Sequence, residues 1–109
     1  MKQYQHPTVD QISLTCVLHA LSDPVRLNFV QCLAQLTCEQ PCGAIPTPVA
    51  KSTMSHHLRV LREAGIIQIR TEGTQSLTSL RSHELETKFP GVLDSVLKAA
   101  SSTSSVEEV

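Results

Sequence analysis

The chain has 109 residues, 40% of them hydrophobic, which suits one domain with its own core and excludes a disordered chain. Only three residues are aromatic and none is tryptophan, so an aliphatic core of packed helices is favoured over a β-sandwich. No apolar run approaches the roughly 20 residues that span a bilayer, and the N-terminus carries no signal-peptide pattern. We therefore expect a cytoplasmic protein without a membrane partner, in which the cysteines are reduced.

The formal net charge of −1 hides an uneven distribution along the chain. Residues 51–81 carry a local charge of +3, whereas the remainder of the chain carries −4. A basic segment in a nearly neutral chain is typical of a localised nucleic-acid-binding face rather than of a general polyanion binder.

The N-terminal third predicts an arm followed by two helices. Residues 1–7 form a flexible arm, and residues 8–21 keep helical spacing of apolar residues on two adjacent stripes. A short helix that is apolar around most of its circumference needs a second partner, and another subunit is the natural candidate. Asp23 and Pro24 then start a helix that runs to about Leu36.

The middle of the chain predicts a loop, a helix and a hairpin. Residues 37–50 contain three prolines and one glycine, so we expect at most one short turn there. An amphipathic helix follows, from Lys51 or Ser52 to the terminating Gly65. A hairpin then follows, with strands at residues 66–70 and 76–81 joined by residues 71–75.

The C-terminal third predicts two helices and a tail. Ser82 caps a short helix that ends near Pro90, and an apolar stripe over residues 92–100 indicates a terminal helix packed on another helix. The serine-rich residues 101–109 are expected to be disordered, which leaves a domain at residues 8–100. This order of elements predicts a mainly α fold with a small β-hairpin, the winged helix-turn-helix.

The helix that begins at Lys51 has a polar face suited to DNA. A helix fits the major groove, hydroxyl groups near its N-terminus approach phosphates, and histidine and arginine reach bases or phosphates. His57, on the opposite face, is expected to be a half-buried support. An ordinary solvated surface would use the same residue types. The candidate DNA-binding residues are Lys51, Ser52, Thr53, Ser55, His56, Arg59, Arg62, Arg70, Thr74 and Gln75.

Two stretches, residues 21–27 (LSDPVRL) and 51–67 (KSTMSHHLRVLREAGII), resemble the ArsR/SmtB family of bacterial repressors. The resemblance covers roughly residues 9–100. It implies a homodimer joined through the first and last helices, which sits on a palindromic DNA operator and leaves it when an inducer binds. The residues expected at the dimer interface are Ile12, Cys16, Val92, Leu93, Val96 and Leu97.

The chain also departs from the family pattern. Ala50 stands where relatives commonly have a hydroxyl residue that caps the recognition helix, so we expect the cap to shift to Ser52. The hairpin tip, often rich in arginine in relatives, has no cation in residues 71–75. We therefore predict weak contacts from the hairpin, limited mainly to Arg70 and the polar tip.

Three interpretations of the cysteines stay open at this stage. Cys38 and Cys42 could form a redox pair, or could bind a thiophilic metal together with a third ligand, since two thiolates do not complete a site. In the third interpretation Cys16 and Cys32 pack in the core or the interface, and the two thiols of the loop have no role. The family's other metal site, on the last helix, is reduced to Asp94. We expect no resident cofactor.

The leading functional hypothesis is a sequence-specific DNA-binding repressor. The alternative is a winged-helix module for protein interaction and dimerisation without specific DNA binding, because fold alone does not fix function. An enzyme is not expected, since the sequence has neither a glycine-rich phosphate loop nor a nucleophile–base arrangement.

Overall fold

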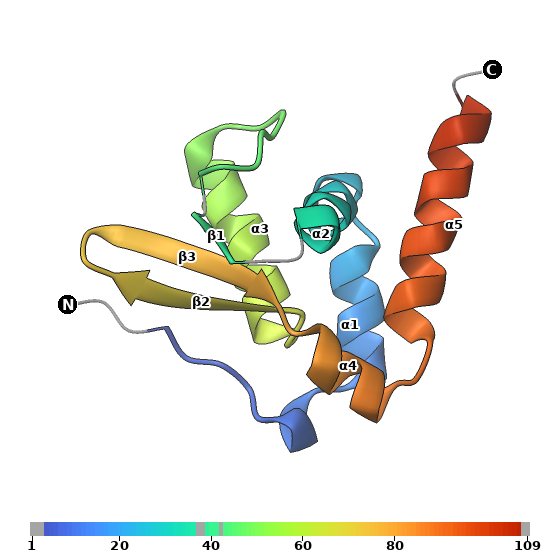
Figure 1. Cartoon of the computed structure of the whole chain (residues 1–109), viewed down its shortest axis with the longest axis horizontal. Coiled ribbons are helices and arrows are strands. Elements are labelled where there is room, and N and C mark those ends of the chain that lie inside the picture. Colours follow the sequence, from blue (N-terminus) through green and yellow to red (C-terminus); the bar gives the residue numbers. More distant parts are fainter. Residues whose placement is uncertain (1–3, 37–38, 42, 108–109) are drawn as a thin grey trace.

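The computed structural model describes residues 4–36, 39–41 and 43–107, and it is mainly helical with a small antiparallel sheet (Figure 1). The order of its elements confirms the predicted winged helix-turn-helix. The elements are a 3-10 turn η1 (Val9–Gln11), helices α1 (Leu14–Leu21) and α2 (Pro24–Leu36), strand β1 (Gln40–Pro41), helix α3 (Lys51–Glu63), strands β2 (Ile67–Glu72) and β3 (Gln75–Leu80), and helices α4 (Ser82–Lys88) and α5 (Val92–Glu107).

The segment predicted as one helix over residues 8–21 is split into η1 and α1. Ile12 adopts an extended conformation between them and is only 3% exposed, because its side chain enters the core. Ser13 then caps α1 by accepting a hydrogen bond from the Cys16 amide. Lys88 of α4 joins this region to the C-terminal part of the chain, because its Nζ donates to the carbonyls of Val9, Asp10 and Ile12.

The predicted start of α2 is confirmed, whereas two other predicted caps are wrong. Asp23 Oδ2 accepts the amide hydrogens of Val25 and Arg26. The N-cap of α3 is Ala50 rather than Ser52, and that of α4 is Arg81 rather than Ser82; neither makes a capping bond with its side chain. In both helices the serine is already inside the first turn.

The sheet has the strand order β1-β3-β2, and both pairs are antiparallel. The predicted hairpin is confirmed, but its connection is shorter than residues 71–75: Glu72 pairs with Gln75, which leaves Gly73 and Thr74 as the turn. Strand β1 was not expected in a proline-rich stretch. It is only two residues long and pairs with the middle of β3.

The core lies where α1, α2 and α3 meet one face of the sheet, and it is aliphatic apart from Phe29. Leu61 at the end of α3 and Ile66 before β2 are fully buried. Gly65 joins these elements at φ 86°, the left-handed conformation expected of a helix-terminating glycine. A Cβ atom there would lie 2.5 Å from Cγ1 of Ile12, so the joint requires glycine.

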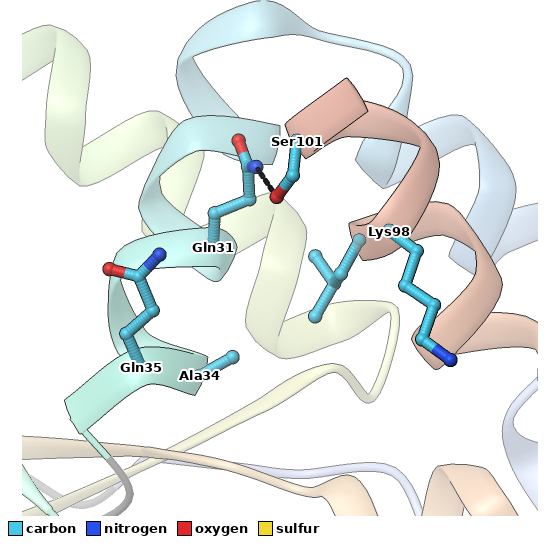
Figure 2. A pocket seen from close by; sticks show the side chains of 6 residues that line it. Gln31, Ala34, Gln35, Lys98 and Ser101 are labelled. Carbon is cyan, nitrogen blue, oxygen red and sulfur yellow. Dashed lines mark hydrogen bonds between the residues drawn. The ribbon is translucent and has the colours of Figure 1, made fainter. Parts of the chain in front are cut away.

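Helix α5 continues to Glu107 and includes residues 101–107. The disordered tail expected from the sequence stays a prediction. Figure 2 shows one contact near the point where disorder was expected to begin: Gln31 of α2 donates a hydrogen bond to the Ser101 hydroxyl at 3.3 Å. This contact joins α5 to α2 across an open groove that Ala34, Gln35 and Lys98 also line.

Candidate nucleic-acid interface

Helix α3 has one buried face and one exposed face. Met54, His57 and Leu61 point into the protein. The opposite face is exposed and contains six of the residues predicted to bind DNA, and the roles of these residues stay predictions: Lys51, Ser52, Thr53, Ser55, His56 and Arg59.

A polar contact in the interior holds α3 against α2. The buried Arg26 donates from Nε to the carbonyl of Ala20 at 2.7 Å, and its Nη1 lies 3.1 Å from Nδ1 of His57. Since a guanidinium cannot accept hydrogen bonds, His57 Nδ1 accepts and the imidazole carries its proton on Nε2. Asp23 Oδ2 lies 3.9 Å from the same nitrogen. These contacts confirm His57 as a support and join the two helices on their buried side.

The carboxylate of Asp23 serves both the start of α2 and this polar contact. Its two hydrogen bonds from backbone amides, with Arg26 the larger contributor, hold the pKa of Asp23 below its ordinary value. The sequence analysis identified Asp23 as a cap but missed Arg26, which has no spacing signal of its own. Its buried position depends on a residue 31 positions further along the chain.

The first turn of α3 is open to an anion. Ala50 offers no side-chain acceptor, so the N-cap residue itself leaves the first amides of the helix without a side-chain cap. Ser52 and Thr53 are exposed beside those amides, and the helix dipole favours negative charge here. This turn can therefore receive a backbone phosphate.

The two arginines near the end of α3 have different surroundings. Arg59 is 69% exposed and pairs with Glu63 one turn later, at 3.1 Å. Arg62 instead donates from Nη1 to the Gln5 carbonyl at 2.5 Å and lies 5.5 Å from the centroid of the Tyr4 ring. The Arg62 guanidinium is therefore engaged by the chain's own N-terminus, which weakens its case as a DNA contact.

Residues 4–7, which we call the arm, lie along α3 and the hairpin; the flexibility expected of this segment stays a prediction. The Tyr4 hydroxyl is 3.2 Å from the Ser76 hydroxyl, and His6 Nε2 accepts the amide hydrogen of Ile69 at 2.9 Å. Arg81 donates to the carbonyl of Pro7. The arm thus covers part of β2, an edge strand that would otherwise present unpaired amides.

The pKa of His6 is lowered from its ordinary value by its surroundings. Partial burial is the largest cause, and the nearby positive charges of Arg62 and Arg81 add to it. The neutral imidazole that results is the form that can accept the Ile69 amide. The sequence analysis gave His6 no role, because its partners are far away in the chain.

The cation of the hairpin is held by carboxylates. Arg70 donates from Nε and Nη2 to the two oxygens of Glu39, at 2.7 Å each, and from Nη1 to Glu72 at 2.8 Å. These hydrogen bonds raise the pKa of Arg70 and lower that of Glu39. Thr74 lies in the exposed turn and Gln75 beside it. Arg70 is therefore not free to meet a phosphate without losing these partners.

The residues predicted at the dimer interface separate into three groups. Ile12 belongs to the core of its own subunit, so the prediction is wrong for this residue. Cys16 is exposed on α1, between Leu14 and Leu18, which are 39% and 45% exposed. The remaining four residues are half-buried on α5: Val92, Leu93, Val96 and Leu97. Of these, Leu93, Val96 and Leu97 pack partly against the core of their own subunit.

The possible sensing residues Cys38 and Cys42 lie outside the described residues, so their redox and metal roles stay predictions. Within the described ranges, no cluster of three or more histidine, cysteine or acidic side chains is arranged to hold a metal ion. No helix in the same ranges is long and apolar enough to cross a membrane.

Comparisons with known proteins agree with this geometry. A family described as a helix-turn-helix domain matches residues 21–70. YceK of Bacillus subtilis (strain 168), an uncharacterised HTH-type transcriptional regulator, is 33% identical over 82 residues, which span 73% of this chain and 82% of YceK.

Two solved structures are similar to most of the chain. A possible transcriptional regulator for arsenical resistance superposes with a TM-score of 0.59 and 30% identity, over 76% of this chain and 84% of that one. The transcriptional repressor BigR from Xylella fastidiosa gives a TM-score of 0.54 and 31% identity, over 70% and 85% of the two chains.

Proposed function

Because the chain belongs to the ArsR/SmtB family of helix-turn-helix transcriptional regulators, we propose that it is a repressor that binds a palindromic operator as a homodimer. DNA binding and transcription regulation follow from the family. The repressor role, the dimer and the operator symmetry are our proposal. One structural relative is itself a transcriptional repressor, which supports the direction of the effect.

The observation that carries the proposal is the exposed polar face of α3. The buried face of the same helix is held to α2 by the contact between Arg26 and His57. A helix that must enter the major groove has to keep its orientation while its outer side chains lose water. In this arrangement the first turn meets a phosphate, His56 faces base edges, and Arg59 lies within reach of the backbone or a guanine.

The dimer is supported by the apolar surface that α1 leaves uncovered. Leu14 and Leu18 are one turn apart and so share one side of α1, where both are exposed. A second copy that covers this surface, together with α5, would bring two α3 helices onto one duplex. Half-sites about 34 Å apart would then follow from the symmetry of the dimer.

The proposal is tested by selecting duplexes from a randomised pool with the purified protein. We expect enrichment of a palindrome, binding of one dimer per duplex, and a steep loss of affinity between about 50 and 200 mM salt. A scrambled duplex of the same composition should bind much more weakly. Absent or salt-insensitive binding would favour a protein-interaction module instead.

The direction of regulation needs a separate measurement. With the selected sequence placed across a promoter, added protein should lower the yield of transcription in vitro. A higher yield would identify an activator and overturn the repressor role while leaving DNA binding intact.

A further inference from the structure

We propose that Glu39 and Glu72 act as a brake on DNA binding, because they hold Arg70 of the hairpin away from the phosphate backbone. The proposal rests on the function proposed above, and it assigns these two carboxylates the role of setting operator affinity.

The geometry around Arg70 is that of a phosphate contact already satisfied within the protein. All three guanidinium nitrogens donate to carboxylate oxygens, at 2.7, 2.7 and 2.8 Å. Glu39 accepts the two-pronged pair of hydrogen bonds that a phosphate would otherwise accept. A DNA phosphate must therefore displace Glu39 before Arg70 can bind it in the same way.

The charge of the hairpin points in the same direction. Between Ile67 and Leu80 the sequence has one cation, Arg70, and one anion, Glu72. With Glu39 beside them the local charge is −1, so the hairpin repels the phosphate backbone. In a winged helix the hairpin lies beside the recognition helix, where cations would strengthen binding.

The sheet positions Arg70 and Glu39 from its two edge strands. Arg70 lies on β2, Glu39 directly precedes β1, and β3 runs between these two strands. Arg70 and Pro41 both pair with Leu77 of β3, so the ion pair bridges the width of the sheet. On β2, Glu72 lies on the same exposed face as Arg70, two residues along the strand.

A DNA phosphate can displace the carboxylates from Arg70, because these ion pairs lie at the surface. The side chains of Arg70 and Glu72 are 46% and 66% exposed, and that of Glu39 is 28% exposed. Exposed ion pairs contribute little to folding stability. Removing the carboxylates should consequently change DNA affinity much more than it changes the melting temperature.

The test uses the full chain with Glu39→Gln and Glu72→Gln, separately and together. Asp94→Asn is the control matched in charge to each single variant, since Asp94 forms an exposed pair with Lys98 on α5, away from the hairpin. The probe is a labelled duplex of about 30 base pairs, selected with the wild-type protein and long enough for two half-sites. Affinity is measured over a range of salt concentrations, and melting temperature is measured in parallel.

We expect the double variant to bind about tenfold more tightly at about 0.1 M salt, with a salt slope steeper by about one, the size of a single phosphate contact. Each single variant should show a smaller gain. Asp94→Asn should bind like the wild type. Adding Arg70→Ala to the double variant should abolish the gain, because the released guanidinium is what makes the new contact.

Several results would overturn the proposal. Unchanged affinity in the double variant, with normal wild-type binding, would remove the brake but leave the proposed function standing. A gain that persists without Arg70, or that Asp94→Asn reproduces, would show a general effect of charge. If neither the wild type nor any variant binds duplex, the proposed function fails together with the brake.

Discussion

Two neighbouring histidines on α3 have opposite environments, and the roles that we predict for them rest on this difference. His57 is buried, and its Nδ1 is engaged by Arg26. His56 is exposed, with its ring centroid 5.9 Å from that of His57. Successive residues of a helix point about 100° apart. Of the two, His56 is therefore the residue that can reach a base edge while α3 keeps its place.

Replacing His56 with alanine should reduce discrimination rather than general affinity. We expect the preference for the selected duplex over a scrambled one to fall by about 1–3 kcal/mol, because a base contact is lost. Arg59→Ala is the comparison variant, and as a phosphate contact it should weaken binding to both duplexes similarly. Titration of both variants with both duplexes measures this. Equal losses on both duplexes for His56→Ala would remove it from base recognition.

His6 gives the arm a dependence on pH whose sign follows from its geometry. In the docked arm Nε2 must be unprotonated to accept the Ile69 amide. The docked pKa lies below the ordinary value of 6.5, so the released arm binds the proton more strongly. Docking should be complete above that value and should weaken as the pH falls below it. The charged groups that face His6 are Arg62 of α3 and Arg81 after β3.

Lowering the pH from about 8 to about 5 should therefore reduce protection of the Ile69 amide against hydrogen exchange, after correction for intrinsic rates. His6→Gln is the matched variant, since a glutamine carbonyl can accept the same hydrogen bond and does not titrate. Its protection should vary little over the range. Wild-type protection that stays constant between these pH values would show that His6 does not control the arm.

The helices and strands that the sequence predicted are those whose residues interact with close neighbours in the chain. Helix α3 was predicted because its apolar residues repeat with helical spacing, and the hairpin because two alternating segments flank a glycine. The exposed face of α3 followed from the same periodicity. Each of these features depends on residues within one turn or one strand of each other.

The features that the sequence did not predict depend on distant partners. Strand β1 exists because β3 offers it a free edge, and a two-residue strand with a proline carries no pattern of its own. The arm makes hydrogen bonds with residues 57 to 74 positions away. Ile12 breaks the first helix because it fills the space beside Gly65. The partners of Arg70 were missed for the same reason.

The joint between α3 and β2 should be sensitive to one added methyl group. Gly65→Ala combines a left-handed backbone with a contact against the buried Ile12, so we expect a loss of about 2–3 kcal/mol in the free energy of unfolding. Gly73→Ala is the control: its φ is also positive, at 61°, but nothing lies within 4 Å, so the loss should be about 1 kcal/mol. Urea denaturation measures both. Equal losses would show that the contact with Ile12 does not constrain the joint.

The proposed DNA-binding surface, on α3 and the hairpin, lies apart from the proposed dimerisation surface, on α1 and α5. The subunit measures 47 × 32 × 22 Å, and along its longest axis the tip of the hairpin and α5 lie at opposite ends, with α3 between them (Figure 1). A second copy that packs on the end formed by α1 and α5 would leave both hairpins and both α3 helices uncovered. Dimerisation and DNA binding can therefore occur together.

Leu18→Asp should convert the proposed dimer to a monomer without unfolding the subunit. Leu18 is 45% exposed in the single subunit, so a charge there remains hydrated in the monomer but would be buried in the dimer. Leu36→Asp is the matched control, since Leu36 is 42% exposed at the end of α2, outside the proposed interface. In sedimentation equilibrium the first variant should be monomeric and the second dimeric, with both retaining wild-type helix content. A dimeric Leu18→Asp variant would place the subunit contact elsewhere. If Leu18→Asp is monomeric, it should also lose the preference for the palindrome, because a monomer has only one α3 helix.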